Sequence, residues 1–329
     1  MRWILAIFLF TRGWLLAIET DFDIAVVGTS PASMLEAIYH ISDNKKVLIL
    51  EADDRCGGAW KSIDICGIRH ADLGCHFIGS DNRLREFFEN YFGCAFICLD
   101  HPYQPMDGSH ARCGNGFYFS KGCYELVARL EEAIASHQNA LLLNKKLQSI
   151  FIDAEQSYIE LNLDDVRYTT AKLILTPASH FRVDNPAFYN AENPPKHTYN
   201  HLYMLIEDPA PSRFTYLNGI CGGMSRAMNL TPFLQMPGSN LQMIAVQTHS
   251  PGDPGEAGRF LDAFKSRGFL DKDARLIATD TYAYHQTMMN VTNVQRLGGG
   301  MIEVLDSSSF AGMIRYVDKW KSTMVPLAK

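Results

Sequence analysis

The pattern of apolar and polar positions near the start of the chain predicts a strand, a helix and a second strand. Residues 23–29 contain a short apolar run that ends at Gly28, which is typical of a buried parallel strand. Apolar residues then recur at helical spacing over residues 31–42. The run Lys46–Leu50 is again apolar and ends on Glu51. This stretch of about thirty residues therefore predicts a strand–helix–strand unit.

Helical and strand patterns alternate further along the chain. Residues 56–80 are rich in glycine with short strand-like pieces, and residues 100–116 have the composition of a loop. Helices are expected over Arg83–Phe92 and Cys123–His137. Strands are expected over Leu147–Asp153, Tyr158–Leu163, Val166–Thr169 and Lys172–Thr176, with a hairpin turn at Asp164-Asp165.

A proline-rich stretch, Asn185–Lys196, is expected to separate two regions of the chain. After it, the pattern predicts three strands and a helix, over His201–Ile206, Arg213–Leu217, Gln242–Thr248 and Gly258–Gly268. Beyond the three glycines at 298–300, a strand is expected over Met301–Leu305 and a closing helix over Phe310–Trp320.

Size and charge narrow the class of protein. With 329 residues, 47% of them hydrophobic, the chain can bury one large core or two modest ones. A net charge of −6 argues against a nucleic-acid partner, which requires a basic face. None of the spacings among the eight cysteines is a metal-binding pattern, so no metal site is predicted. A reduced, cytoplasmic protein is the expectation, with disulfides as the less favoured alternative.

The first twenty residues leave the localisation open. An apolar run, Trp3–Phe10, follows Arg2 and has the length of a signal-peptide core, but Arg12 interrupts the apolar stretch. Residues 1–20 are therefore either a signal or membrane anchor, an N-terminal extension over residues 1–22, or the product of a start codon chosen too far upstream. Membrane association through this segment is the less favoured alternative.

The turn after the first strand carries the first functional signal. Dinucleotide folds place a tight glycine turn before a helix N-terminus, whose free N–H groups and dipole stabilise a pyrophosphate. The usual pattern is G-x-G-x-x-G, whereas residues 28–33 read Gly-Thr-Ser-Pro-Ala-Ser. Ser30 is a good N-cap and Pro31 suits the first helical position. A phosphate-binding turn through Gly28, Ser30, Pro31 and Ala32 and an ordinary capped turn both remain open.

Glu51 shifts the balance toward nucleotide binding. It ends the second strand, twenty-three residues after Gly28. An acidic residue near this spacing accepts hydrogen bonds from the ribose hydroxyls of a bound dinucleotide. The alternative is a solvated carboxylate at a strand end, and the preceding turn favours the ribose role.

Residues 51–60, Glu-Ala-Asp-Asp-Arg-Cys-Gly-Gly-Ala-Trp, resemble the E-A-x-x-R-x-G-G segment of FAD-dependent amine oxidase-like flavoproteins. This superfamily includes protoporphyrinogen oxidases, phytoene desaturases and UDP-galactopyranose mutases. The glycine pair lets the backbone approach a cofactor closely, and NAD enzymes do not generally need it. The resemblance therefore implies FAD, held by Glu51, Ala52, Arg55, Gly57, Gly58, Ala59 and Trp60, with Arg55 on a phosphate.

Other segments extend the resemblance over most of the chain after residue 22. Residues 71–78 look like the D-x-G-x-H-x-I strand of these flavoproteins, and residues 143–150 like their adenine-side strand, which would place Leu147 near the adenine. Residues 173–177 look like their returning V-I-x-T-P strand. Two features depart from the pattern: the reduced glycine fingerprint, and a C-terminal flavin motif whose nearest equivalent ends at Asp306 without a Gly-Asp pair.

The fold implied is α/β, with a FAD-binding Rossmann-type domain and a second, smaller α+β substrate domain. The first domain would span residues 23–180, with residues 291–329 returning to it, and the second residues 181–290. The activity implied is hydride transfer from a small-molecule substrate to flavin. The alternatives are a redox-neutral flavoenzyme resembling the sugar mutases, and a degenerate nucleotide-binding scaffold without catalysis.

Three residues are catalytic candidates. His76 lies where the strand of the resembling proteins faces the flavin and would orient substrate or pass a proton; packing is the equal alternative. Arg226 lies in a segment that looks like the substrate domain of the mutases, and would hold an anionic substrate or pair with a surface carboxylate. Tyr284 shares one strand face with Tyr282, and would wall the flavin pocket or simply pack.

Overall fold

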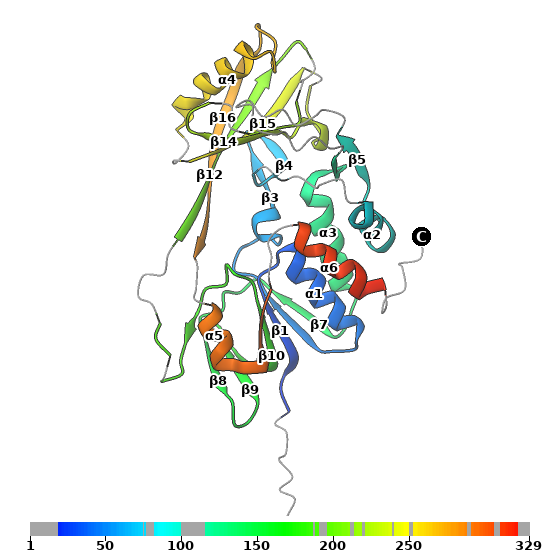
Figure 1. The fold of residues 1–329 in the computed structure, drawn as a ribbon, viewed down its shortest axis with the longest axis vertical. Coiled ribbons are helices and arrows are strands. Elements are labelled where there is room, and N and C mark those ends of the chain that lie inside the picture. The colour runs from blue at the N-terminus through cyan, green and yellow to red at the C-terminus, as the bar shows by residue number, and fades with distance from the viewer. Residues whose placement is uncertain are drawn as a thin grey trace, which may run out of the picture.

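The computed structural model describes residues 19–74, 76, 82–99, 116–186, 188–190, 196–210, 214–218, 221–238, 240–249, 253–287, 291–305 and 310–321. The predictions for residues 1–18, for the loop over 100–115 and for Asp306 lie outside these residues. The structure confirms the expected fold class: a mixed sheet of Rossmann type and a separate antiparallel sheet form two parts of the molecule (Figure 1).

Apolar strands build the centre of the first sheet. β1 (Phe22–Val27) lies between β2 (Val47–Leu50) and β10 (Arg167–Leu175), and β7 (Ala140–Leu143) flanks β2, all in parallel. On the other side of β10 lie β8 (Ser149–Asp153), β9 (Tyr158–Asn162), β11 (Arg182–Val183) and β17 (Ile302–Val304). Most side chains of β1 and β2 are buried, as their continuous apolar runs require of strands covered on both faces.

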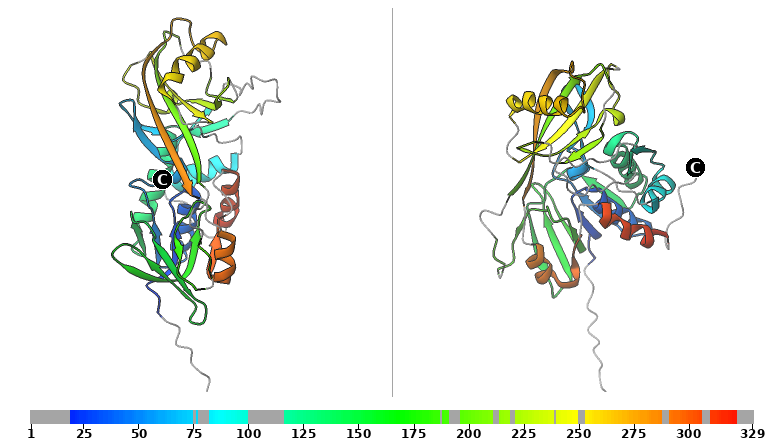
Figure 2. Two further views of the ribbon diagram at one scale, coloured as in Figure 1. Left: turned by 90° about the vertical axis from the view of Figure 1, so that its left-hand side faces the viewer. Right: turned by 45° about the horizontal axis from the view of Figure 1, so that its top comes forward.

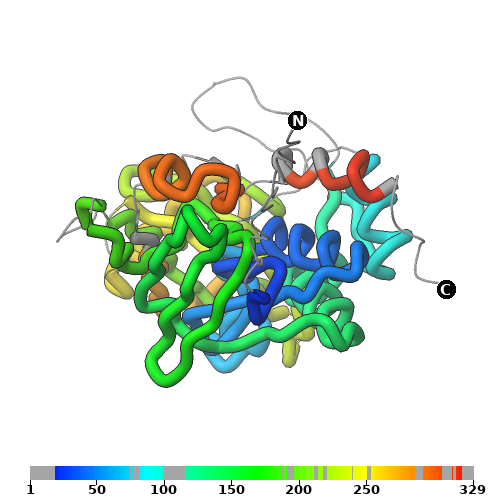
Figure 3. Tube along the Cα trace, turned by 90° about the horizontal axis from the view of Figure 1, so that it is seen from below, coloured from blue at the N-terminus to red at the C-terminus, as the bar shows by residue number. Residues whose placement is uncertain are grey.

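Helices cover the first sheet. α1 (Pro31–Ser42) contacts β1 and β2 and packs against α3 (Gly122–Ala135) and the closing helix α6 (Phe310–Lys321), as Figure 3 shows from below. α2 (Asn82–Phe92) packs against α3 and α6, and α5 (Val291–Gly298) packs beside β17. The C-terminal segment therefore returns to the first sheet through both β17 and α6.

The second part is an antiparallel sheet of order β13-β14-β15-β12-β16. Its strands are β12 (Lys196–Glu207), β13 (Tyr216–Asn218), β14 (Met224–Asn229), β15 (Leu241–Thr248) and β16 (Arg275–Thr287). Leu202, Met204 and Ile206 pack in one cluster with Phe260 and Phe264 of α4 (Ala257–Ser266). Tyr203 and Leu205 alternate with them and belong to the core cluster of the first domain, so the opposite face, called here the inner face, points toward that domain.

Two long strands and two small ribbons join the parts. β12 and β16 pair over almost their whole length and run from the second sheet down to the first domain (Figures 1 and 2). β3 (Ser62–Ile65) and β4 (Ile68–Asp72) form a hairpin that reaches the second sheet, and β5 (Phe96–Leu99) pairs with β6 (Gly116–Phe119). Short 3-10 turns lie at Gly58–Trp60, Thr231–Phe233, Pro254–Glu256 and Gly299–Met301.

Two predicted strands proved to be one. The predicted strands Val166–Thr169 and Lys172–Thr176 form the single strand β10. Its first half pairs antiparallel with β9 through the predicted hairpin, and its second half pairs parallel with β1 and β17. The pattern was misread because β10 changes partners at Thr170, where a half-exposed hairpin strand becomes a buried central strand.

Within the described part of the chain, no helix combines the length and the apolar character that crossing a membrane requires.

Candidate cofactor and active site

The turn after β1 has the geometry that a glycine allows. Gly28 has a φ of +93°, and a Cβ atom at this position would lie 3.1 Å from Oγ1 of Thr176. The N–H of Gly28 donates to the carbonyl oxygen of Leu50 over 2.8 Å, which ties the turn to the end of β2. Any larger side chain at residue 28 therefore meets both a strained backbone and the loop after β10.

The predicted cap of α1 is confirmed. Oγ of Ser30 accepts the N–H of Ser33 over 3.3 Å and contacts Oγ of Ser33 at 2.9 Å, and Pro31 opens the helix. Capping in this way leaves further N–H groups of the first turn without helical partners. The positive end of α1 therefore points at the space beyond Gly28, where an anion is favoured.

Glu51 is buried at the end of β2, and the chain itself supplies most of its hydrogen bonds. One carboxylate oxygen accepts the N–H of Thr29 over 3.1 Å and also the hydroxyl of Thr29. The other accepts the N–H of Asp53 over 2.9 Å. A carboxylate has about four lone-pair positions, so a ribose hydroxyl has room for about one bond rather than two.

The glycine pair lies against the same turn. The N–H of Gly57 reaches both Oγ1 of Thr29, at 3.0 Å, and its carbonyl oxygen, at 3.1 Å. Gly57 has a φ of +113°, and a Cβ there would lie 2.8 Å from the backbone of Lys61. Gly58, with a φ of +56°, faces the backbone of Ser30. Thr29 thus connects the first turn, Glu51 and the glycine pair.

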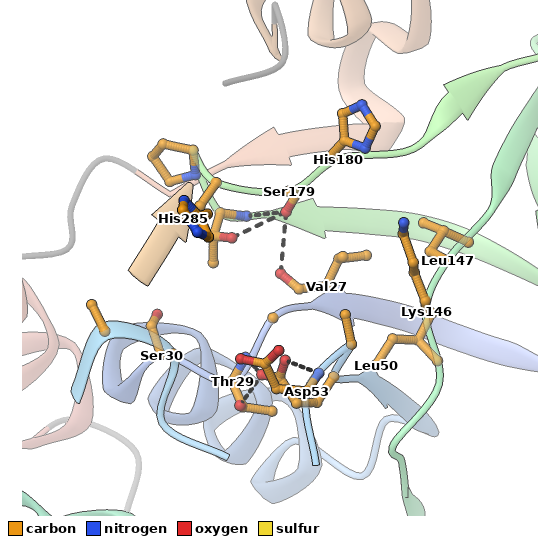
Figure 4. Close-up of a pocket in the computed structure, with 18 of the residues that line it drawn as sticks. Val27, Thr29, Ser30, Leu50, Asp53, Lys146, Leu147, Ser179, His180 and His285 are labelled. Carbon is orange, nitrogen blue, oxygen red and sulfur yellow. Dashed lines mark hydrogen bonds between the residues drawn. The ribbon is translucent and has the colours of Figure 1, made fainter. Parts of the chain in front are cut away.

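These elements line one cavity of about 480 Å³ at the carboxyl edge of the first sheet. In Figure 4, Ser30 lies toward one side of the cavity and Leu147 and Lys146 toward the other, with Val27 and Leu50 between them. The cavity takes its lining from three regions: residues 27–30, 50–53 and 58–60; residues 145–147 and 176–180; and His197, Tyr199, Tyr284 and His285.

Eight of the predicted cofactor residues line this cavity: Gly28, Ser30, Glu51, Ala52, Gly58, Ala59, Trp60 and Leu147. Gly57 shapes the turn from behind, and Pro31 and Ala32 are buried in α1. Arg55 does not line the cavity. Its guanidinium forms a salt bridge of 3.0 Å with Asp64 of β3 and donates to the carbonyl oxygen of Ser62. The phosphate role predicted for Arg55 finds no support in this arrangement, because β3 provides a competing carboxylate.

His76 lies beneath Trp60. The two rings stack with centroids 4.2 Å apart, and Nε2 of His76 lies 2.8 Å from the carbonyl oxygen of Ala59 and 2.7 Å from that of Leu73. Nε2 therefore carries the proton and donates it to the main chain. Burial lowers the pKa of His76 to about 4, so the imidazole is neutral at pH 7. This arrangement favours the packing role of His76 over proton transfer at Nε2.

The other two candidates lie on the second sheet. Tyr284 of β16 lines the cavity, with its ring 6.4 Å from that of Tyr199 on β12. Arg226 of β14 does not line it; one guanidinium nitrogen lies 3.4 Å from the hydroxyl oxygen of Tyr216. The cavity therefore brings Tyr284 to the cofactor residues, and Arg226 belongs to a neighbouring part of the inner face.

Sequence reasoning missed the cavity residues of β12. His197 and Tyr199 line the cavity, and His201 and Tyr203 follow at every second position. The signal was available in the alternation His-x-Tyr-x-His-x-Tyr over residues 197–203, which places four ring side chains on one strand face. The prediction for this strand began only at His201, after the proline-rich stretch, and so excluded the part that reaches the cavity.

Comparison with known proteins agrees with this geometry. Residues 26–91 match the family of NAD(P)-binding Rossmann-like domains, which covers the turn, Glu51 and the glycine pair. No curated protein sequence matches the chain significantly.

Solved structures share the fold over nearly the whole described chain. A candidate protoporphyrinogen oxidase from Exiguobacterium sp. 255-15 superposes with a TM-score of 0.64 at 10% identity, over 90% of this chain and 97% of that one. Cyclohexylamine oxidase from Brevibacterium oxydans IH-35A gives 0.63 at 12% identity, over 90% and 96%. A reduced UDP-galactopyranose mutase gives 0.59 at 11% identity, over 90% and 87%. The chain therefore has a Rossmann-like domain and the fold of the amine oxidase-like flavoproteins.

Proposed function

We propose that the protein is a FAD-dependent oxidoreductase of the amine oxidase-like superfamily that transfers hydride from a small-molecule substrate to flavin. One observation carries this proposal: a single cavity joins the Gly28 turn, the N-terminus of α1, Glu51 and the glycine pair to aromatic side chains of the second sheet. A mononucleotide site needs only the first of these parts, whereas an extended dinucleotide such as FAD needs the whole length of the cavity.

The described residues fit the parts of FAD. The capped start of α1 and the turn at Gly28 suit the pyrophosphate, because their N–H groups and the helix dipole favour negative charge. Glu51 and Leu147, on one side, suit the adenosine. Ala59 and Trp60, on the other, suit the flavin ring, because the left-handed backbone at Gly57 and Gly58 keeps side chains out of the way.

The protein's own groups orient and insulate the reaction. Bound flavin would supply the hydride acceptor, and oxygen or another acceptor would take the two electrons away again. Trp60, fixed by its stacking on His76, closes one wall of the cavity, and Tyr199 and Tyr284 close another. The neutral imidazole of His76 holds the backbone at Ala59 and Leu73 through Nε2 and so positions this wall.

A titration of the purified protein with FAD, followed by quenching of flavin fluorescence, tests the proposal. Gly28→Val is expected to weaken FAD binding at least about tenfold, because its side chain enters the turn beside Thr176. Gly67→Val is the matched control, since Gly67 also has a positive φ but meets nothing within 4 Å and does not line the cavity. Equal FAD affinity of both variants and the wild type would contradict the proposed site.

The rival functions predict different outcomes. A redox-neutral enzyme, as the likeness to UDP-galactopyranose mutase suggests, would bind FAD but consume no electron acceptor during turnover. A non-catalytic scaffold would bind FAD weakly, and the way Thr29 occupies Glu51 is the feature that favours it.

A further inference from the structure

A row of polar side chains crosses the inner face of the second sheet. Gln247 of β15 is paired in register with Arg226 of β14 on one side and with His201 of β12 on the other. His201 is in turn opposite Tyr282 of β16. Residues directly opposite one another in a sheet project to the same side, so Arg226, Gln247, His201 and Tyr282 form one row.

The row faces the loop that follows β4. The ring of His201 lies over Gly74, where an added Cβ would come within 2.7 Å of Cε1 of the imidazole. The hydroxyl of Tyr203, two residues along β12, donates to the carbonyl oxygen of Asp72 over 2.9 Å and accepts the N–H of Gly74 over 3.0 Å. His76 follows in the same loop and stacks on Trp60 of the cavity. The row therefore lies next to the wall assigned to the flavin ring.

The groups of the row are hydrogen-bond donors or cations. The guanidinium of Arg226, the amide of Gln247 and the phenol of Tyr282 can each donate, and no member of the row is acidic. Two carboxylates near the row, Asp72 and Asp53, have partners of their own. Asp72 accepts from Tyr118 and from the N–H of Cys123, and Asp53 pairs with Lys61 at 2.7 Å.

One acidic residue, Asp280, and one basic residue, Lys61, lie near the row. Asp280, one row further along β16, is exposed and accepts the N–H of Thr281. Its charge contributes to the raised pKa of the Cys66 thiol. Lys61 donates to Asp53 and also lies 5.7 Å from the ring centre of Tyr282. The inner face around the row is therefore donor-rich, with its acidic group at the exposed edge.

His201 supplies an independent sign of a missing partner. Its side chain is buried at 5% exposure, and Nδ1 has no hydrogen-bond partner. A buried polar atom of this kind destabilises the folded protein when nothing satisfies it. Burial lowers the pKa of His201 to about 4, with smaller effects from the neighbouring ring of His76 and from the positive charge of Arg226. A bound anion would relieve both effects, because it accepts a hydrogen bond from a ring N–H and stabilises the protonated form of the ring.

We propose that the row formed by Arg226, Gln247, His201 and Tyr282 binds an anionic group of the substrate, a carboxylate or a phosphate. The term substrate rests on the proposed function, whereas the anion site itself does not. A primary amine, which is a cation at pH 7, would meet Arg226 and no carboxylate in this row. The chain therefore oxidises a molecule that carries a carboxylate or phosphate close to the reacting carbon.

Calorimetric titrations of the FAD-saturated protein with inorganic phosphate, acetate and methylammonium at pH 7 test this. FAD saturation occupies the N-terminus of α1, so that phosphate has to bind elsewhere. Phosphate or acetate is expected to bind, and whichever binds more tightly identifies the anionic group. Arg226→Gln should weaken that binding at least about tenfold, whereas Arg129→Gln, an exposed site on α3, should leave it unchanged.

An NMR titration of the histidine rings tests the same site in the wild-type protein, so its result does not depend on whether a variant folds. In the wild type, added anion should raise the pKa of His201 and leave the chemical shifts of the exposed His137 ring unchanged. Binding of methylammonium in place of the anions, or anion binding that Arg226→Gln does not alter, would overturn the inference. If the protein takes up no FAD but still binds anions through Arg226, only the proposed function fails. If it takes up FAD and binds no anion, only this inference fails.

Discussion

At the scale of single residues, Thr29 organises the cofactor site. It is fully buried, its N–H and hydroxyl donate to Glu51, and its two oxygens accept the N–H of Gly57. The residues that the sequence pointed to, Gly28, Glu51 and the glycine pair, are therefore held together by one that it did not. A threonine in the variable position of a glycine turn has no pattern of its own, and its bonds reach residues 22 and 28 positions away.

Replacing Thr29 by valine keeps the shape of the side chain and removes its hydroxyl. Glu51 then loses a buried donor and Gly57 loses one acceptor. The free energy of unfolding is expected to fall by about 1–3 kcal/mol, as measured by urea denaturation. The matched change Thr198→Val, at an exposed position, should alter it by no more than about 0.5 kcal/mol. Equal stabilities of the two variants would contradict the role assigned to Thr29.

The contacts of two predicted site residues, His76 and Arg55, could not be deduced from the sequence. The resemblance predicted His76 on a strand that faces the flavin, whereas β4 ends at Asp72 and His76 lies in the loop that follows. The atoms that its ring contacts depend on how this loop folds back onto Ala59. Arg55 is the second case. Its position beside the glycine pair was predictable, but its pairing with Asp64 arises only because β3 follows immediately.

At the scale of elements, α6 closes the first domain. Its residue Trp320 is fully buried among Phe87, Tyr91 and Phe92 of α2. Lys319 reaches α1, where it donates to the buried carboxylate of Glu36 over 2.8 Å. The C-terminal helix is therefore fixed to α2 by aromatic packing and to α1 by a partly buried ion pair.

The ion pair predicts a pH dependence of stability. Burial alone raises the pKa of Glu36, but Nε2 of His40, 3.1 Å away, and the hydrogen bond from Lys319 outweigh it and lower the pKa to about 2 from 4.5. The folded state thus binds fewer protons than the unfolded state in this window, so the stabilisation is complete above pH 4.5 and is lost as the pH falls toward 2.

Glu36→Gln should therefore flatten the decline in stability between pH 4.5 and 2. Urea denaturation at steps across this window measures it, with Glu132→Gln, an exposed partner of Arg129, as the control. The wild type and the control should lose stability in parallel, by about 1–3 kcal/mol more than Glu36→Gln. Parallel curves for all three proteins would show that Glu36 does not contribute in this way.

Periodicity predicted the elements that carry a clear apolar pattern. The helices α1, α2, α3, α4 and α6 lie within a few residues of their predicted ranges, because each buries one regular face. The strand β14, Met224–Asn229, was not predicted as such, since Ser225 and Arg226 interrupt its alternation. The helix α5 was missed because it is short and ends at three consecutive glycines.

At the scale of the whole molecule, the candidate site depends on both parts. The first sheet supplies the turn, Glu51 and the glycine pair, and the strands β12 and β16 bring Tyr199 and Tyr284 to the same cavity. The local motif near the N-terminus was readable because its residues lie within forty positions of one another. Of the cavity residues on the second sheet, Tyr284 was predicted and His197, Tyr199 and His285 were missed. Strand register decides which side chains face the cavity, and register depends on pairing across long stretches of chain.

The absorption spectrum of the purified protein, after incubation with FAD and removal of the excess, tests the central claim most directly. We expect a yellow protein with a flavin band at about 450 nm, and release of FAD in a stoichiometric amount on denaturation. A folded protein that stays colourless, and releases no flavin after the same treatment, would contradict it.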